Sequence, residues 1–128
     1  MNKIIILTAR LYLMFMLAKQ SRLVKEKDFK NIFKFGKSSY VNAKIFRIKI
    51  LANALEANRY GIIISTKVSK KAVERNKLKR QIRAVLKELD KKLSSGFDLA
   101  VIVSPAAKNQ EYKVIKSELE KILFSLKL

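Results

Sequence analysis

The chain has 128 residues, which is enough for one domain with a hydrophobic core but too few for two. It carries 29 Lys and Arg against 10 Asp and Glu, a formal net charge of +19, and 49% of its residues are hydrophobic. The hydrophobic fraction argues against disorder, and the charge excess indicates an anionic partner. Nucleic acid is the first candidate for that partner, and an anionic membrane is the second.

Histidine and cysteine are absent, which excludes Ser-His-Asp triads, cysteine nucleophiles and the usual zinc sites. The ten acidic residues are mostly single and flanked by Lys or Arg, a pattern typical of ion pairs rather than of metal ligands or a general-acid pair. We therefore predict no catalytic and no metal-binding residue in this chain. The lack of cysteine fits a reducing cytoplasm, which is the predicted location.

The chain begins with an apolar N-terminal extension, residues 1–18, and residues 19–128 are predicted to form the domain. A positive charge followed by apolar residues resembles a secretory signal, but an arginine interrupts the run. The apolar piece that remains is too short to span a bilayer. A translation start at Met14 or Met16 is the favoured interpretation, with a signal peptide and a short packing helix as alternatives.

The first elements of the predicted domain are a helix and two strands. Apolar residues recur at helical spacing from Glu26 to Phe35, and Gly36 follows as a C-terminal stop. The stretch AKIFRIKIL alternates apolar and charged residues, which predicts a half-buried strand. Arg59–Ser65 is a short apolar run suited to a central strand.

A basic loop then leads into a long helix, which ends at a Ser-Ser-Gly sequence. Phe97–Val103 is another buried strand, and an amphipathic helix follows from Tyr112 to Leu126. The order of helix, two or three strands, helix, strand and helix predicts an α/β two-layer sandwich, with helices packed on one sheet. The core stripe of the long helix consists of Leu78, Ile82, Val85, Leu86, Leu89 and Leu93.

Positive charge concentrates in the basic loop and in the first half of the long helix. Between Thr66 and Arg83 there are eight Lys or Arg and one acid, Glu74. Like charges four residues apart destabilise a helix, so this pattern favours an external polyanion over an ordinary solvated face. The helix N-terminus also attracts anions. The predicted phosphate-binding residues are Lys67, Lys70, Lys71, Arg75, Asn76, Lys79, Arg80 and Arg83.

Phe29 and Phe33 share one side of the first predicted helix. Their spacing fits core packing, and it fits equally well a pair of exposed aromatic platforms on which single-stranded bases stack. The sequence pattern leaves both interpretations open.

Three blocks in order carry a family resemblance: SRLVKEKDFKNIFKFGKS, RYGIIISTKVSKKAVERNKLKRQIRAVL and GFDLAVIVSPAA. From about Ser21 to its end the chain resembles the protein subunit of bacterial ribonuclease P. The hallmark of that family is Arg-Asn-x-x-Lys-Arg-x-x-Arg, which is matched here by Arg75, Asn76, Lys79, Arg80 and Arg83.

The resemblance implies an αβββαβα sandwich with a left-handed crossover, and a subunit that assists a ribozyme. In that family the RNA subunit holds the catalytic Mg²⁺ and cleaves precursor tRNA to give the mature 5′ end. The protein is then an accessory subunit, a monomer or 1:1 with the RNA, with no cofactor of its own and no membrane partner. The basic helix is implied to face RNA, and a cleft to hold the 5′ leader. The residues of this chain that match the cleft are Phe29, Phe33, Ser65 and Lys67.

One departure from the family falls at Arg47, where a strand position that is often tyrosine is basic. Other functions stay open on the residues alone. A module for a different structured RNA would need the basic helix but no leader cleft. A membrane-surface protein would use the apolar extension. A metal-dependent nuclease is disfavoured for want of clustered carboxylates.

Overall fold

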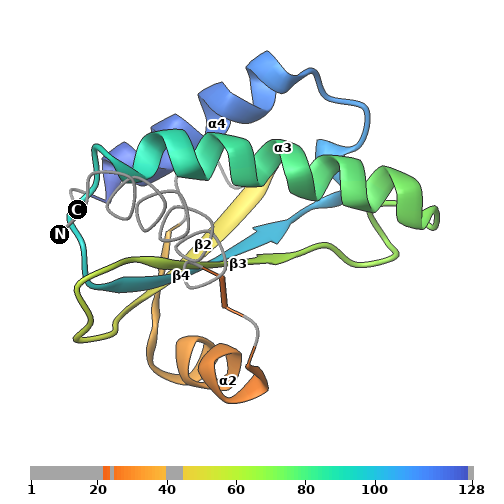
Figure 1. The fold of residues 1–128 in the computed structure, drawn as a ribbon. Coiled ribbons are helices and arrows are strands. Elements are labelled where there is room, and N and C mark those ends of the chain that lie inside the picture. Colours follow the sequence, from red (N-terminus) through yellow and green to blue (C-terminus); the bar gives the residue numbers. More distant parts are fainter. Residues whose placement is uncertain (1–21, 24, 40–44, 127–128) are drawn as a thin grey trace, which may run out of the picture.

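The computed structural model describes residues 22–23, 25–39 and 45–126, which form one four-stranded sheet with helices against both of its faces (Figure 1). This arrangement confirms the predicted αβββαβα order, and the predicted extension, residues 1–18, lies outside the described residues. The elements are α2 (Glu26–Phe35), β1 (Lys37–Ser39), β2 (Phe46–Ala52), β3 (Arg59–Ile63), α3 (Ala72–Asp90), β4 (Phe97–Val103), the 3-10 turn η1 (Pro105–Ala107) and α4 (Tyr112–Ser125).

The strands lie in the order β1-β2-β4-β3. Strand β2 runs antiparallel to both β1 and β4, whereas β3 and β4 are parallel. A parallel pair needs a crossover connection, and α3 supplies it by returning the chain from the end of β3 to the start of β4. Helix α3 therefore lies across the sheet directly after the basic loop.

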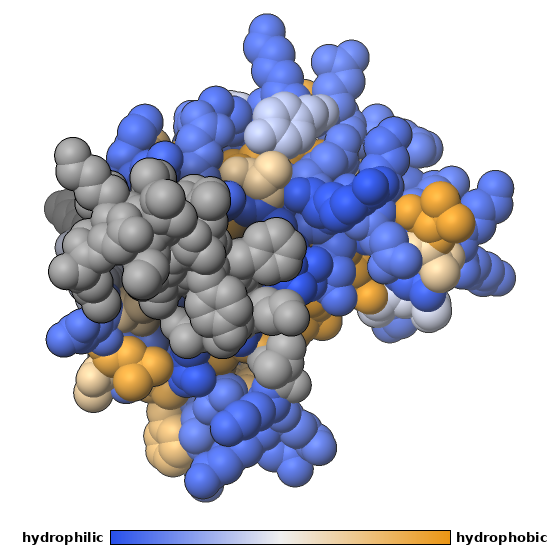
Figure 2. Space-filling model, in the orientation of Figure 1, coloured by the Kyte–Doolittle hydropathy of each residue, from blue (hydrophilic) through white to orange (hydrophobic). Residues whose placement is uncertain are grey.

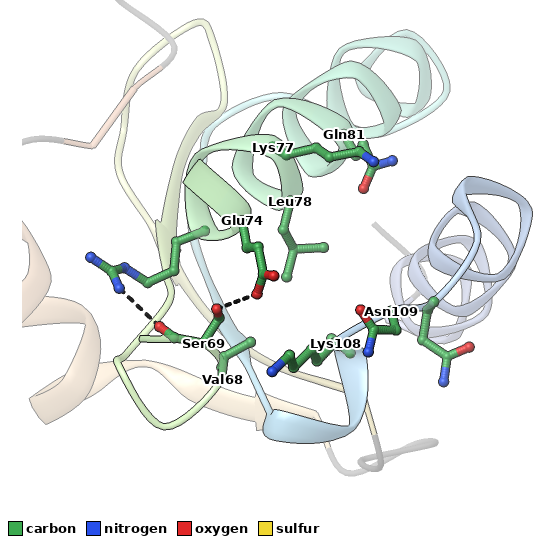
Figure 3. A pocket seen from close by; sticks show the side chains of 11 residues that line it. Val68, Ser69, Glu74, Lys77, Leu78, Gln81, Lys108 and Asn109 are labelled. Carbon is green, nitrogen blue, oxygen red and sulfur yellow. Dashed lines mark hydrogen bonds between the residues drawn. The ribbon is translucent and has the colours of Figure 1, made fainter. Parts of the chain in front are cut away.

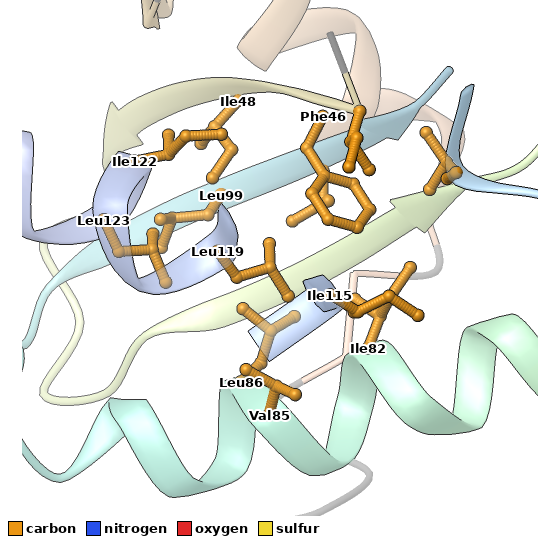
Figure 4. Close-up of a cluster of buried hydrophobic side chains, with 14 of the residues drawn as sticks. Phe46, Ile48, Ile82, Val85, Leu86, Leu99, Ile115, Leu119, Ile122 and Leu123 are labelled. Atoms are coloured by element: carbon orange, nitrogen blue, oxygen red, sulfur yellow. The ribbon is translucent and has the colours of Figure 1, made fainter. Parts of the chain in front are cut away.

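The larger hydrophobic core lies between the sheet and the two helices α3 and α4 (Figure 4). Alternate residues of β2 and β4 point into it, as expected for strands with period-two side chains. Its side chains that are fully shielded from solvent include Phe46, Ile48, Ile82, Val85, Leu99, Ile115, Leu119, Ile122 and Leu123. Five of the six residues of the predicted apolar stripe are thus confirmed as buried core, namely Leu78, Ile82, Val85, Leu86 and Leu89.

Helix α2 covers the opposite face of the sheet, where Leu23, Ile32 and Ala100 form a smaller buried cluster flanked by Phe29 and Leu51. The predicted two layers are therefore the sheet and the α3–α4 layer, and α2 adds a partial third layer. Amphipathic spacing shows that a helix packs on a sheet, but it does not show which face the helix covers.

Two predicted boundaries shift in the structure. Strand β3 ends at Ile63 rather than Ser65, and α3 ends at Asp90, so that Leu93 packs partly buried against the core from the turn that follows. Buried Asn58 stabilises this turn, because its amide donates to Asp90 Oδ1 at 3.0 Å and to the Ser94 carbonyl at 2.9 Å. A tertiary contact, rather than helix periodicity, marks the end of α3.

Candidate nucleic-acid interface

Ser69 organises the basic loop before α3 (Figure 3). Its hydroxyl donates to the Glu74 carboxylate and accepts from the Lys71 backbone N–H at 3.2 Å, while its carbonyl accepts from Arg75 Nη1 at 2.8 Å. Lys71, the N-cap residue, makes no side-chain cap hydrogen bond, so Ser69 takes over that role. The loop is thereby fixed relative to the first turn of α3.

The same contact shifts the ionisation of the single acid in this basic region. The Ser69 hydroxyl bond lowers the pKa of Glu74, and the nearby charges of Lys108 and Lys71 lower it further, while burial opposes the shift. Glu74 is therefore held as a carboxylate that braces the loop. Lys67, Lys70 and Lys71 lie in this loop, as predicted, and all three are exposed.

Helix α3 presents two of the motif residues along the flank that faces the β3 edge. Asp90 marks this flank, because its carboxylate accepts a 2.5 Å hydrogen bond from the hydroxyl of Tyr60 in β3. Arg83 and Lys79 lie two and three turns before Asp90 on the same side of the helix, and both are half-buried. Asn76 and Arg80 are exposed on the outer side.

The motif cations are not neutralised by carboxylates within the described residues. The ion pairs found there involve Lys30, Arg59, Lys116 and Lys121, and no Lys or Arg between 67 and 83 takes part in one. In the space-filling view, hydrophilic side chains gather over α3 and over α2 (Figure 2). The Lys and Arg side chains of α3 up to Arg83 therefore have no carboxylate partner among the described residues.

The α2 face of the sheet holds the two predicted aromatics in different surroundings. Phe29 packs over the backbone of Gly61 in β3, and a Cβ added there would sit 2.4 Å from Phe29 Cε1. Phe33 is 43% exposed, and Lys49 Nζ lies 5.4 Å from its ring centroid and donates to its carbonyl at 3.3 Å. Phe29 thus shapes the surface, and Phe33 with Lys49 is the exposed part of it.

A row of side chains beside α2 continues this surface across the sheet. Strand register places Arg47 opposite Ile102, and Ile102 opposite Ile63, with all three on the α2 face. Arg47 is exposed and the two isoleucines are half-buried, so the row is an apolar floor with a cation at its β2 end. Ser65 and Lys67 follow just past the end of β3 and are exposed.

Arg59 joins α2 to the sheet on the other side of that helix. Its guanidinium binds both oxygens of buried Asp98 at 2.8 and 2.7 Å and reaches Asp28 of α2 at 3.4 Å. The hydrogen bond with Asp98 is the main cause that raises the pKa of Arg59, against an opposing effect of burial. This paired charge positions α2, and with it Phe29 and Phe33.

The predicted residues consequently fall into two groups on opposite faces of the sheet. The loop after β3, which carries Lys67, connects the strand that borders the α2-face group to α3. Sequence reasoning missed Lys49 beside Phe33; its outward position in β2 was visible, but its pairing with an α2 residue depends on tertiary register. Arg47, where the chain departs from the family, lies two residues before Lys49 in β2 and on the same face of the sheet.

One pocket in the described part of the chain lies elsewhere, between the start of α3 and the turn after η1 (Figure 3). Ser69, Glu74, Lys77, Gln81 and Lys108 line it, together with Asn109 at a φ of 62°. It shares only Arg75 with the predicted site residues. Its lining mixes both charges and has no arrangement suited to a particular ligand.

Neither a metal cluster nor a membrane span is found among the described residues. No group of three or more Asp and Glu there converges as metal ligands, and none of the described helices is long and apolar enough to cross a membrane. What these residues offer is cations, half-exposed apolar side chains and an exposed aromatic. Such a surface can bind a polyanion.

Comparison with known proteins gives a consistent result. The family model described as Ribonuclease P matches residues 17–127. The chain is 40% identical to the ribonuclease P protein component of Cyanothece sp. over 122 residues, covering 84% of this chain and 93% of that protein. It is 37% identical to the component of Synechocystis sp. over 106 residues, covering 83% and 85%.

Solved structures agree with the sequence relatives. The fold is similar to a Staphylococcus aureus RNase P protein mutant with defective mRNA degradation activity, with a TM-score of 0.81, 34% identity, and coverage of 91% of this chain and 97% of that chain. It is also similar to the RNase P protein from Thermotoga maritima, with a TM-score of 0.71, 30% identity, and coverage of 80% and 94%.

Proposed function

Because this chain belongs to the bacterial ribonuclease P protein family, we propose that it binds a catalytic RNA subunit and helps it to remove the 5′ leader of precursor tRNA. The chemistry then belongs to the RNA and its Mg²⁺, and the protein contributes binding. The proposal also includes a cytoplasmic location and a 1:1 assembly with the RNA.

The observation that carries this proposal is the unpaired cationic flank of α3. Lys79, Arg80 and Arg83 have no carboxylate partner among the described residues, although like charges so spaced repel one another. A polyanion removes that repulsion, and each phosphate that is neutralised releases a counterion. A folded RNA with closely spaced phosphates fits this surface.

The α2 face supports the second half of the proposal, which is leader binding. Phe33 offers an exposed ring, Lys49 and Arg47 offer charge, and Ile63 and Ile102 offer an apolar floor. Stacking of unpaired bases on an aromatic ring, with cations nearby for the backbone, binds single strands with little sequence preference. A leader of variable sequence is such a strand.

The proposal is tested by cleavage of a precursor tRNA with a bacterial ribonuclease P RNA at low Mg²⁺, with and without the protein. The expected result is a protein-dependent rise in correct 5′ processing, because added positive charge replaces part of the Mg²⁺ that the RNA assembly needs. The double variant Arg75→Ala plus Arg80→Ala should lose most of this rise. Its salt dependence of RNA binding should flatten by about one unit of slope per lost contact at most.

A matched double variant, Lys92→Ala plus Lys113→Ala, removes the same charge from exposed positions outside the α3 flank. It should retain the rise. Because Arg75 also bonds the Ser69 carbonyl, the single variant Arg80→Ala at an exposed position separates RNA binding from folding. Equal activity of both double variants would contradict the assignment of α3.

A further inference from the structure

Arg22 lies outside the motif helix, yet the sheet brings it to the same flank. The chain at residues 22–23 runs beside the outer edge of β3, with a parallel bridge between Arg22 and Tyr60 and a 2.8 Å hydrogen bond from the Leu23 N–H to the Tyr60 carbonyl. This segment therefore has a fixed register on β3, although it is only a short piece of chain.

The register determines which way Arg22 points. Residues opposite each other in a bridge share a face of the sheet, and successive residues alternate between faces. Leu23 is 5% exposed in the cluster on the α2 face. Arg22 therefore lies on the same face as Tyr60, which packs against the core under α3 and α4. At the edge of the sheet, that face borders the flank of α3.

Arg83 is the residue of α3 that meets Arg22 there. It lies two helical turns, about 11 Å, before Asp90 on the flank of α3 that faces β3, and the Asp90 carboxylate is bound to the hydroxyl of Tyr60, the bridge partner of Arg22. Burial lowers the pKa of Arg83, and the positive charge of Arg22 lowers it further, which shows that the two guanidinium groups repel each other.

No described carboxylate balances this pair. Asp90 already accepts hydrogen bonds from Tyr60 and from Asn58 at 3.0 Å, and neither Arg22 nor Arg83 forms an ion pair with a described residue. Two neighbouring guanidinium groups, one exposed and one half-buried, can bind one phosphate together, because each offers paired N–H donors.

We propose that Arg22 and Arg83 together hold one phosphate of the bound RNA, at the edge where residues 22–23 pair with β3. This site rests on the proposed function and extends it, because it adds a residue from outside the Arg-Asn-x-x-Lys-Arg-x-x-Arg motif. It also means that RNA binding bridges α3 and the segment that leads into α2.

Titration of a bacterial ribonuclease P RNA transcript with the full chain tests the site. Arg22→Ala and Arg83→Ala should each weaken binding roughly tenfold, as for loss of a charge-assisted hydrogen bond. Each should reduce the slope of log affinity against log salt by about 0.7 to 0.9. The double variant should be little worse than either single variant, because both arginines act on one phosphate.

Lys25→Ala is the matched control, since it removes one exposed charge from the same segment on the α2 side of the bridge. Arg22→Lys should recover part of the affinity, because lysine keeps the charge but not the paired donors. Arg22 is exposed, so the melting temperature of Arg22→Ala should equal that of the wild type. Arg22→Ala that binds RNA as tightly as Lys25→Ala overturns the site while leaving the proposed function intact.

Two further outcomes also decide against the site. Effects of Arg22→Ala and Arg83→Ala that multiply fully in the double variant would mean two separate contacts. Thermal stabilisation by inorganic phosphate that depends on Arg22, with RNA affinity unchanged in the variant, would mean a site for a free anion. A wild-type chain that does not bind the transcript would overturn the site and the proposed function together.

Discussion

Gly61 of β3 and Phe29 of α2 are in direct contact, so that the ring of Phe29 occupies the space where a side chain at position 61 would begin. Alanine there would bring its Cβ to 2.4 Å from Phe29 Cε1 and 3.1 Å from Leu23 Cβ. The ring is the more mobile of these neighbours, and it must move away from the sheet.

Gly61→Ala should therefore lower the free energy of unfolding by about 1–3 kcal/mol, as overpacking does, and should displace one wall of the α2-face surface. Urea unfolding measures the first effect. Affinity for a leader-bearing precursor tRNA, compared with affinity for the same tRNA without its leader, measures the second. A variant with unchanged stability and unchanged leader preference would show that Phe29 has no role in shaping this surface.

Phe33→Ala should reduce leader binding by about 1–3 kcal/mol per stacked base while changing stability little, because the ring is 43% exposed. Phe124→Ala is the matched control, since Phe124 is 48% exposed on α4, on the opposite face of the sheet. The two variants should have similar melting temperatures and different affinities for precursor tRNA. Equal affinities would rule out Phe33 as a stacking platform.

Arg59→Ala should destabilise the fold by about 3 kcal/mol, because among the described residues it leaves the buried Asp98 carboxylate with only the Asn53 amide, at 2.9 Å, as a side-chain partner. Lys30→Ala removes an ion pair with Glu26 whose side chains are 75% and 84% exposed, and it should cost under about 0.5 kcal/mol. Chemical denaturation of both variants gives the comparison. Similar losses of stability in the two variants would mean that the buried Arg59–Asp98 pair contributes no more than an exposed ion pair.

Ser69→Ala should change how stability depends on pH. The pKa of Glu74 is lowered in the folded protein, chiefly by the Ser69 hydroxyl, so this contact stabilises the fold above the unfolded-state pKa of about 4.3. The stabilisation is lost as the pH falls through the lower folded-state value.

The melting-temperature difference between wild type and Ser69→Ala should therefore be largest near neutral pH and shrink in acid. A part that does not depend on pH will remain, because Ser69 also accepts from the Lys71 N–H. Ser117→Ala, at an exposed position in α4, should show no such pH dependence. A constant difference across the range would show that the Ser69–Glu74 bond adds nothing specific to the ionised form.

The core under α3 and α4 follows from apolar spacing alone, because a stripe such as Leu78, Ile82, Val85 and Leu89 has a single face to bury. Strand β2 can likewise be predicted from its alternation of apolar and charged residues, and β4 from its buried apolar run. The short strand β1 is not, since its three residues, Lys-Ser-Ser, are polar and pair only with β2. Its existence depends on a neighbour rather than on its own sequence.

The candidate site divides in the same way. The charge pattern and the motif placed the cations on α3, because both are properties of one helix. The pairing of Lys49 with Phe33, and of Arg22 with Arg83, joins segments from different elements and depends on the register of β2 and β3. Ser69 likewise gave no sequence signal, because a serine two residues before an N-cap acquires its role only from the path of the loop.

The two unequal hydrophobic clusters imply that the molecule does not open uniformly. Helix α2 rests on a cluster of three buried residues and on Arg59, whereas α3 and α4 share a cluster of eighteen. Backbone amides in α2 should then exchange with deuterium sooner than those in β4 or α4, as units with few buried contacts do. The α2-face surface proposed to bind single-stranded RNA would thus have the least rigid helix of the described fold as its wall. Slower deuterium exchange in α2 would then be a sensitive sign that single-stranded RNA has bound.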